Sequence, residues 1–118
     1  MPLIDYSLAK RATVVALRGG RLTRRDVCDA HPELMRAARH VGEPARAQCP
    51  VCAERLVHVL YVFGADLRQH SGRVWPRSGL RELHHSVEEF SCYVIEVCTA
   101  CSWNHLVQRH ILGRRHAG

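Results

Sequence analysis

Two stretches of sequence decide the fold of this chain, Cys49-Pro50-Val51-Cys52 and Cys98-Thr99-Ala100-Cys101. Zn²⁺ prefers four soft ligands at the corners of a tetrahedron, and a CxxC turn places two sulfurs on one side of an ion with little backbone strain. Two such turns leave no open coordination position, which is typical of a structural site rather than a catalytic one. We therefore expect one structural Zn²⁺, held by Cys49, Cys52, Cys98 and Cys101.

Other chemistry for these four cysteines is weighed against the surrounding sequence. A thioredoxin-like CxxC opens a helix directly after a strand, whereas Cys49 follows residues 42–48, which are typical of a linker. Iron in a rubredoxin-like site uses the same four ligands, so iron remains an alternative to zinc. A site in which His105 replaces one cysteine is a further alternative. Cys28 and Cys92 have no partner at ligand spacing, so we expect each to be a small buried apolar residue.

The composition is that of a globular protein, with 118 residues of which 47% are hydrophobic and 24% charged. This length fits one small domain, or a domain plus an appendage. No apolar run approaches the roughly 18 residues of a membrane span. Asp5 and Lys10 lie where a secretory signal would be apolar, so we expect a cytoplasmic protein. Disulfides are disfavoured in that reducing compartment.

The charge balance is basic, with 17 Lys and Arg against 11 Asp and Glu and a formal net charge of +6. All of these cations except Lys10 are arginines, a bias that is also typical of a GC-rich genome. Arg suits phosphate and carboxylate recognition better than Lys. Four thiolates around one Zn²⁺ would lower the net charge by two, so the balance permits nucleic-acid binding without requiring it.

We expect residues 1–45 to form an N-terminal helical segment. Apolar residues recur at helical spacing over residues 3–18 and predict a first helix, which a Gly-Gly pair ends. Thr23 and Asp26 then form a pair typical of a capping box, at the start of a short second helix that extends to about residue 30.

The third helix begins at Pro32, which suits a first helical turn, and ends near Gly42. Three basic helices suggest a helix-turn-helix, but that motif needs three well-packed helices and the middle one here is very short. We therefore favour an amphipathic arm that packs on the zinc-ribbon part of the chain, residues 46–118, or on a partner. Its candidate partner contacts are the arginines Arg21, Arg24, Arg25, Arg36 and Arg39.

Residues 46–118 are expected to form a zinc-ribbon domain. β-Branched and aromatic residues predict strands over residues 56–63 and 90–97, the second leading directly into a CxxC motif. Residues 64–89 between these strands are interpreted as a helical insertion, a loop followed by a helix over residues 78–89.

The tail over residues 103–112 fits a helix or a strand. We choose a strand, because the second CxxC turn requires a returning strand to pair with residues 90–97. Residues 113–118 are expected to be frayed. The predicted fold class is therefore α+β, a zinc ribbon with a small antiparallel sheet and a helical insertion, preceded by a short helical arm.

Several aromatic side chains outside the cysteine motifs are candidates for function. Trp103 could stack on a base, but we favour a role in shielding the metal site and the sheet. Trp75, beside Pro76 in the loop, is the better candidate for an exposed partner contact. His84 and His85 have glutamates four residues on, but only one such pair can point the same way on a helix, so we favour a solvated helix face over a second metal site.

The cysteine frame resembles the broad zinc-ribbon class, and the fuller pattern resembles a family of small uncharacterised actinobacterial proteins. The resemblance covers nearly the whole chain and implies no activity. It supports the four cysteines as ligands and draws attention to Cys28 and to the run Trp103-Asn104-His105. It is carried by Asp26-Val27-Cys28-Asp29-Ala30-His31-Pro32, Cys49-Pro50-Val51-Cys52, Val62-Phe63-Gly64, Glu96-Val97-Cys98 and Trp103-Asn104-His105-Leu106-Val107.

No enzyme motif stands out, since Gly19-Gly20 lacks the Lys-Ser/Thr of a P-loop and no serine lies in a nucleophile elbow. We expect a non-catalytic structural-zinc protein that docks on a larger assembly, with RNA polymerase or the ribosome suggested by analogy with other zinc ribbons. The alternatives are a direct nucleic-acid-binding zinc ribbon, a thiol redox or zinc-sensing protein, and an unrecognised enzyme.

Overall fold

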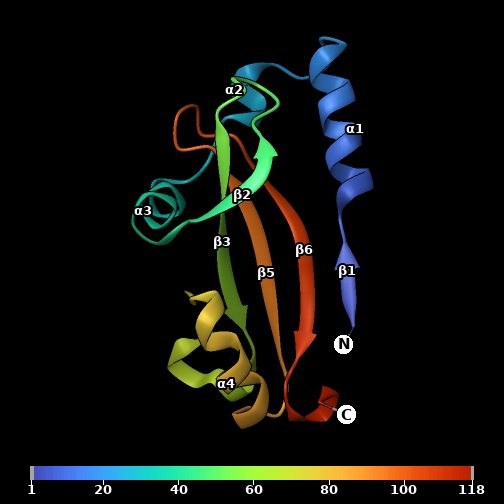
Figure 1. Cartoon of the computed structure of the whole chain (residues 1–118). Coiled ribbons are helices and arrows are strands. Elements are labelled where there is room, and N and C mark those ends of the chain that lie inside the picture. The colour runs from blue at the N-terminus through green and yellow to red at the C-terminus, as the bar shows by residue number, and fades with distance from the viewer. Residues whose placement is uncertain (1, 118) are drawn as a thin grey trace. The chain divides into compact units, whose positions relative to one another are not determined.

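The computed structural model describes residues 2–117, which form a mixed α/β fold around a six-stranded antiparallel sheet. The strands follow the order β1-β6-β5-β3-β2, and β4 pairs with β3 (Figure 1). Their bounds are Leu3–Asp5 (β1), Glu43–Gln48 (β2), Arg55–Phe63 (β3), Arg73–Val74 (β4), Phe90–Val97 (β5) and Asn104–Leu112 (β6). The α-helices are Ser7–Arg18 (α1), Arg24–Val27 (α2), Pro32–Val41 (α3) and Leu80–Ser86 (α4). Short 3-10 helices cover Ala65–His70, Arg77–Gly79 and Arg114–His116.

The chain divides into two compact units. The cysteine unit comprises residues 6–59 and 95–107, and the second unit comprises residues 2–5, 60–94 and 108–117. Strands β3, β5 and β6 contribute residues to both units. The domain boundary predicted between residues 45 and 46 stays a prediction.

The two shorter helices of the cysteine unit begin where their capping residues predict. Thr23 Oγ1 accepts a hydrogen bond from the Asp26 N–H, and Asp26 Oδ2 accepts one from the Thr23 N–H at 2.7 Å. This reciprocal capping box starts α2. Pro32 occupies the first turn of α3, and His31 Nδ1 accepts from the Glu33 N–H at 3.1 Å. The two predicted starts are confirmed because each depends only on residues within one turn. The predicted end of the second helix near residue 30 is wrong, since α2 ends at Val27.

The predicted start of the first helix is wrong by four residues. Leu3–Asp5 is the strand β1, which pairs antiparallel with β6, and α1 begins only at Ser7. The backbone N–H and C=O groups of these three residues pair with the edge of β6. Helical periodicity in the sequence cannot reveal such pairing with a distant strand. Met1, which the helical segment included, lies outside the described residues.

The linker predicted before the first CxxC motif is also wrong. Glu43–Gln48 forms β2, which pairs antiparallel with β3 through Glu43 opposite His58 and Gln48 opposite Arg55. Pro44 is tolerated because β2 is the last strand in the order, where the missing N–H breaks no ladder on the outer side. The strand therefore leads straight into Cys49.

The strands predicted over residues 56–63, 90–97 and 103–112 are confirmed as β3, β5 and β6 within a residue. The helix predicted over residues 78–89 is shorter, since α4 covers Leu80–Ser86 and the backbone becomes extended at Val87.

The tail is ordered where it was expected to be frayed. The N–H groups of Arg114 and Arg115 donate to the carbonyls of Val87 and Glu88 at 2.8 and 3.1 Å. A 3-10 turn over Arg114–His116 follows. Gly118 lies outside the described residues. No helix within residues 2–117 is both long and apolar enough to cross a bilayer.

Candidate metal centre

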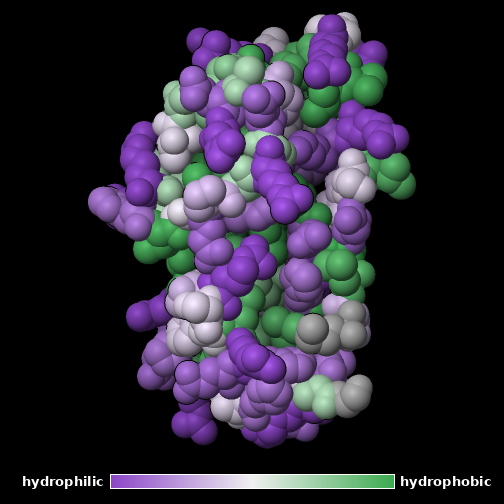
Figure 2. All heavy atoms as spheres, viewed as in Figure 1, coloured by the Kyte–Doolittle hydropathy of each residue, from purple (hydrophilic) through white to green (hydrophobic). Residues whose placement is uncertain are grey.

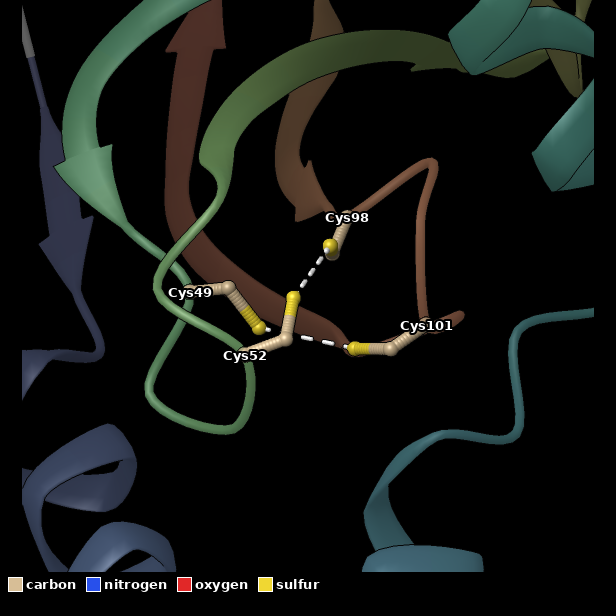
Figure 3. Close-up of side chains that lie close together, drawn as sticks. All are labelled: Cys49, Cys52, Cys98 and Cys101. Carbon is tan, nitrogen blue, oxygen red and sulfur yellow. Dashed lines mark hydrogen bonds between the residues drawn. The ribbon is translucent and has the colours of Figure 1, made fainter.

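Four cysteines that are far apart in sequence come together in the cysteine unit. Cys49 and Cys52 lie on the turn between β2 and β3, and Cys98 and Cys101 lie on the turn between β5 and β6. Figure 3 shows their four sulfurs pointing toward one another. Their Sγ atoms all lie within 4.8 Å of one another, and no His, Asp or Glu of the described chain belongs to the group. The four cysteines that the sequence singles out are therefore brought together, without His105.

The two turns share the same backbone geometry. In the first, the Ala53 N–H donates to the Cys49 carbonyl at 2.9 Å and the Cys49 N–H donates to the Glu54 carbonyl at 2.7 Å. In the second, Ser102 and Trp103 take the places of Ala53 and Glu54, with distances of 3.0 and 2.8 Å. The residue after each motif adopts a left-handed conformation, with φ of 65° at Ala53 and 72° at Ser102. Such angles are uncommon outside glycine, so the two CxxC turns are equivalent, and we call them the first and second knuckle.

The sulfur spacing fits one tetrahedral ion. Cys49 Sγ lies 3.5 Å from Cys101 Sγ, and Cys52 Sγ lies 3.5 Å from Cys98 Sγ (Figure 3). Metal–sulfur bonds of about 2.3 Å would put tetrahedral sulfurs about 3.8 Å apart. A disulfide would require about 2.05 Å, and none of the six cysteines forms one. The donor set could therefore hold one metal ion.

Burial and backbone hydrogen bonds act on these thiols in opposite directions. Burial raises the pKa of Cys49 and of Cys101. At Cys52, the backbone N–H of Glu54 lowers the pKa. Because the metal ligand is the thiolate, an ion must displace protons from the buried thiols when it binds. The four converging sulfurs would hold a dication, whose charge would make this displacement favourable.

A fifth thiol, that of Cys28, lies beside the centre. The sequence did not predict this position. The Cys28 thiol donates to Cys101 Sγ at 3.6 Å, although Cys28 is not one of the four mutually close sulfurs. Two more contacts join this segment to the second knuckle. The Ala30 N–H donates to the Ser102 carbonyl at 3.1 Å, and Asn104 Nδ2 donates to Asp29 Oδ1 at 3.0 Å. The connection from α2 to α3 is thus attached directly to a metal knuckle.

The fully buried Trp103 packs beside the centre. It belongs to one apolar cluster with Cys49, Cys98 and Leu56. Its Nε1 donates to Glu96 at 3.3 Å, and Lys10 of α1 forms an ion pair with the same Glu96 oxygen at 2.7 Å. The favoured role of Trp103, shielding the site and the sheet, agrees with this burial. The single lysine of the chain attaches α1 to the buried carboxylate, a role that the sequence did not reveal.

The predicted partner contacts fall into both units. All five arginines are exposed on the cysteine unit, in or around α2 and α3, where Figure 2 shows many hydrophilic side chains on the visible face. They are Arg21, Arg24, Arg25, Arg36 and Arg39. Trp75 belongs to the second unit, where its half-buried ring lies 5.5 Å from that of His70 and its Nε1 has no hydrogen-bond partner. Their roles as contacts stay predictions.

A basic groove adjoins the second knuckle. Its volume is about 420 Å³, and its cationic side chains are Arg36 and Arg39, with His40 beside them. Ser102, which directly follows the ligand Cys101, forms one wall. The remaining lining is Ala30, Pro32 and Met35, so no carboxylate of residues 2–117 lines this groove.

The molecule is thus a mixed α/β protein with one closed four-thiol centre. Its sequence matches DUF5318, described as a family of unknown function, over residues 2–118, and the chain belongs to that family. Similar proteins include uncharacterized protein Mb0050 of Mycobacterium bovis and uncharacterized proteins MT0055 and Rv0049 of Mycobacterium tuberculosis. Each is 42% identical over 111 residues, which cover 93% of this chain and 81% of the relative. No solved structure matches the chain. The resemblance to an actinobacterial family is confirmed.

Proposed function

We propose that this chain is a non-catalytic structural-zinc protein of the cytoplasm. It docks on a larger assembly of the transcription or translation machinery, RNA polymerase or the ribosome. One observation carries the docking proposal, the basic groove of Arg36 and Arg39 whose wall is the second knuckle. The zinc-ribbon class remains part of this proposal.

The closed thiol set favours a structural ion. With four cysteine ligands, a tetrahedral Zn²⁺ has no vacant position for water or substrate, so its contribution is to folding. Structural zinc supplies on the order of 10 kcal/mol of binding free energy coupled to folding. A typical domain is stable by about 5–15 kcal/mol in total, so the ion decides whether the cysteine unit keeps its shape.

The ion also positions the basic surface. Cys28, Ala30 and Asp29 join the start of α3 to the second knuckle through the three contacts described above. Loss of metal would release that knuckle and, with it, the wall of the groove. Arginine forks suit phosphate oxygens, which the RNA surface of a ribosome or the nucleic acid on a polymerase would present.

The test is capture of the zinc-loaded chain from native lysate of its own organism, followed by identification of ribosomal proteins and polymerase subunits. We expect one of these two assemblies to be enriched and to remain bound after nuclease treatment. The double variant Arg36→Glu/Arg39→Glu should lose at least about tenfold of this enrichment, since several charged contacts are reversed. The matched control is Arg68→Glu/Arg73→Glu, two exposed arginines of the second unit, which should bind normally.

The alternatives give different results. Complete loss of the captured material on nuclease treatment, with affinity for naked RNA that falls steeply with salt, would replace docking with direct nucleic-acid binding. Enrichment of neither assembly, or an equal effect of the two double variants, would overturn the proposal.

A further inference from the structure

The second unit contains a pocket that neither the metal centre nor the basic groove uses. It has a volume of about 420 Å³ and lies between α4 and the strands β3, β5 and β6. This volume is within the range of small-molecule sites. Leu60, Val94 and Leu112 come from the strands and are at most 6% exposed, and Leu80 faces them from α4. The pocket therefore has an apolar interior.

The polar part of the lining is basic. Arg77, Arg81, His84, His85 and His110 complete it, and no Asp or Glu of the described chain is among the lining residues. Glu82, on the same helix as Arg81, is also outside the lining. These histidines do not form a metal site, since the one group of three or more possible ligands within residues 2–117 is the cysteine cluster.

Hydrogen bonding holds one histidine of this lining in a neutral form. His84 Nδ1 accepts from the Gly113 backbone N–H at 2.9 Å, and an amide can only donate, so the ring proton lies on Nε2. Burial lowers the pKa of His84 and of His110. Arg77 further lowers the pKa of His110, which indicates that positive charge is already present where the ring lies.

We infer that this pocket binds a small amphipathic carboxylate, with its apolar chain against the leucines and Val94 and its headgroup at the arginines. A guanidinium fork matches a carboxylate in a bidentate geometry. A singly charged headgroup also loses less hydration on partial burial than a dianionic phosphate does. The apolar interior of the pocket disfavours inorganic anions as the preferred ligand, because most of it offers them no polar partner.

The experiment is titration of the zinc-loaded full chain with sodium octanoate, followed by calorimetry and by amide shifts in NMR spectra. We expect saturable binding with shifts at α4, β5 and β6, and much weaker binding of octanol, octylammonium and acetate. Arg81→Gln should weaken octanoate at least about tenfold through loss of a charged hydrogen bond. Leu80→Trp, which fills the pocket, should abolish binding. Arg73→Gln, an exposed arginine outside the lining, is the matched control.

Zinc content and the unfolding curve are measured on every variant, so that loss of fold is separated from loss of the site. Equal affinity for octanol and octanoate would overturn the role of the charged groups. Tighter binding of octyl phosphate would overturn the carboxylate assignment, and absence of octanoate binding to the folded wild type would overturn the proposal.

Discussion

Cys28 and Cys92 illustrate how two unpaired cysteines of one sequence differ in role. Cys28 donates to Cys101 of the cysteine cluster and packs on the core beside the knuckles, whereas Cys92 is fully buried in the second unit. Burial raises the pKa of Cys92 to about 11, so it stays a thiol at neutral pH. The expectation of a small buried residue is confirmed for Cys92. It is wrong for Cys28, which is only half-buried and whose thiol bonds to Cys101, 73 positions away.

Cys98→Ser should remove one of the four ligands and release the metal. We expect retention of metal against a chelator to fall by more than about 100-fold, beyond the effect of losing a group that only contacts a ligand. Cys92→Ala is the matched control, because it deletes a buried sulfur that lies outside the cysteine cluster. It should cost about 1 kcal/mol of stability and keep one metal per chain. Equal metal loss in both variants would contradict the ligand assignment.

Lys10→Ala should destabilise the cysteine unit by about 3 kcal/mol, because Glu96 would keep a buried charge without its ion-pair partner. The double variant Lys10→Met/Glu96→Gln removes both charges while leaving an acceptor for Trp103 Nε1, and it should recover most of the loss. Urea unfolding of the zinc-loaded proteins measures both. A double variant less stable than Lys10→Ala would show that the pair itself, rather than the unpaired charge, dominates.

The histidines of the second unit predict loss of stability in acid. Burial lowers the pKa of His110, and Arg77 lowers it further. The unfolded state therefore takes up a proton near pH 6.5 that the folded state resists, so stability falls as the pH drops below that value. The same sign holds for His84, beside His85 and His116. His110→Gln should lose less stability between pH 7.5 and 5.5 than the wild type in urea unfolding, and an equal loss would refute this cause.

Elements whose signals lie within their own sequence were the ones that could be predicted. The capping pair Thr23 and Asp26, the proline that opens α3, and the β-branched runs of β3 and β5 each specify an element locally. The strands β1 and β2 could not be predicted, because they are short, and β2 contains Pro44. Each exists through pairing with a partner strand distant in sequence. Within the site, the four clustered cysteines followed from spacing, whereas the contacts of Cys28 and Glu96 required the folded arrangement.

The C-terminal segment over residues 113–117 packs against the residues that follow α4. Gly113 has φ of 122°, and a Cβ there would meet the Glu88 carbonyl oxygen. Gly113→Ala should therefore destabilise the second unit by more than about 3 kcal/mol, through backbone strain and the clash together. Gly20→Ala is the control, since Gly20 also has a positive φ, of 80°, but a Cβ would meet nothing within 4 Å. It should cost only about 1–2 kcal/mol. Thermal unfolding compares the two, and equal losses would contradict the clash.

At the scale of the whole molecule, each unit carries its own candidate site. The cysteine unit holds the thiol centre and the basic groove beside it, and the second unit holds the apolar pocket. Four thiolates around one Zn²⁺ would offset part of the net charge of +6. Binding of a polyanion would therefore depend more on the local arginines of the groove than on the net charge of the protein. The docking and carboxylate proposals therefore depend on different residues and can fail separately.

The most direct measurement is the metal content and sulfur coordination of the intact protein purified from its native organism, by elemental analysis and X-ray absorption. We predict one zinc per chain, with four sulfur neighbours at about 2.3 Å and no nitrogen or oxygen ligand. Iron in the same four-sulfur shell would contradict the assignment of zinc. A metal-free protein with Cys49, Cys52, Cys98 and Cys101 joined as disulfides would contradict the metal centre itself.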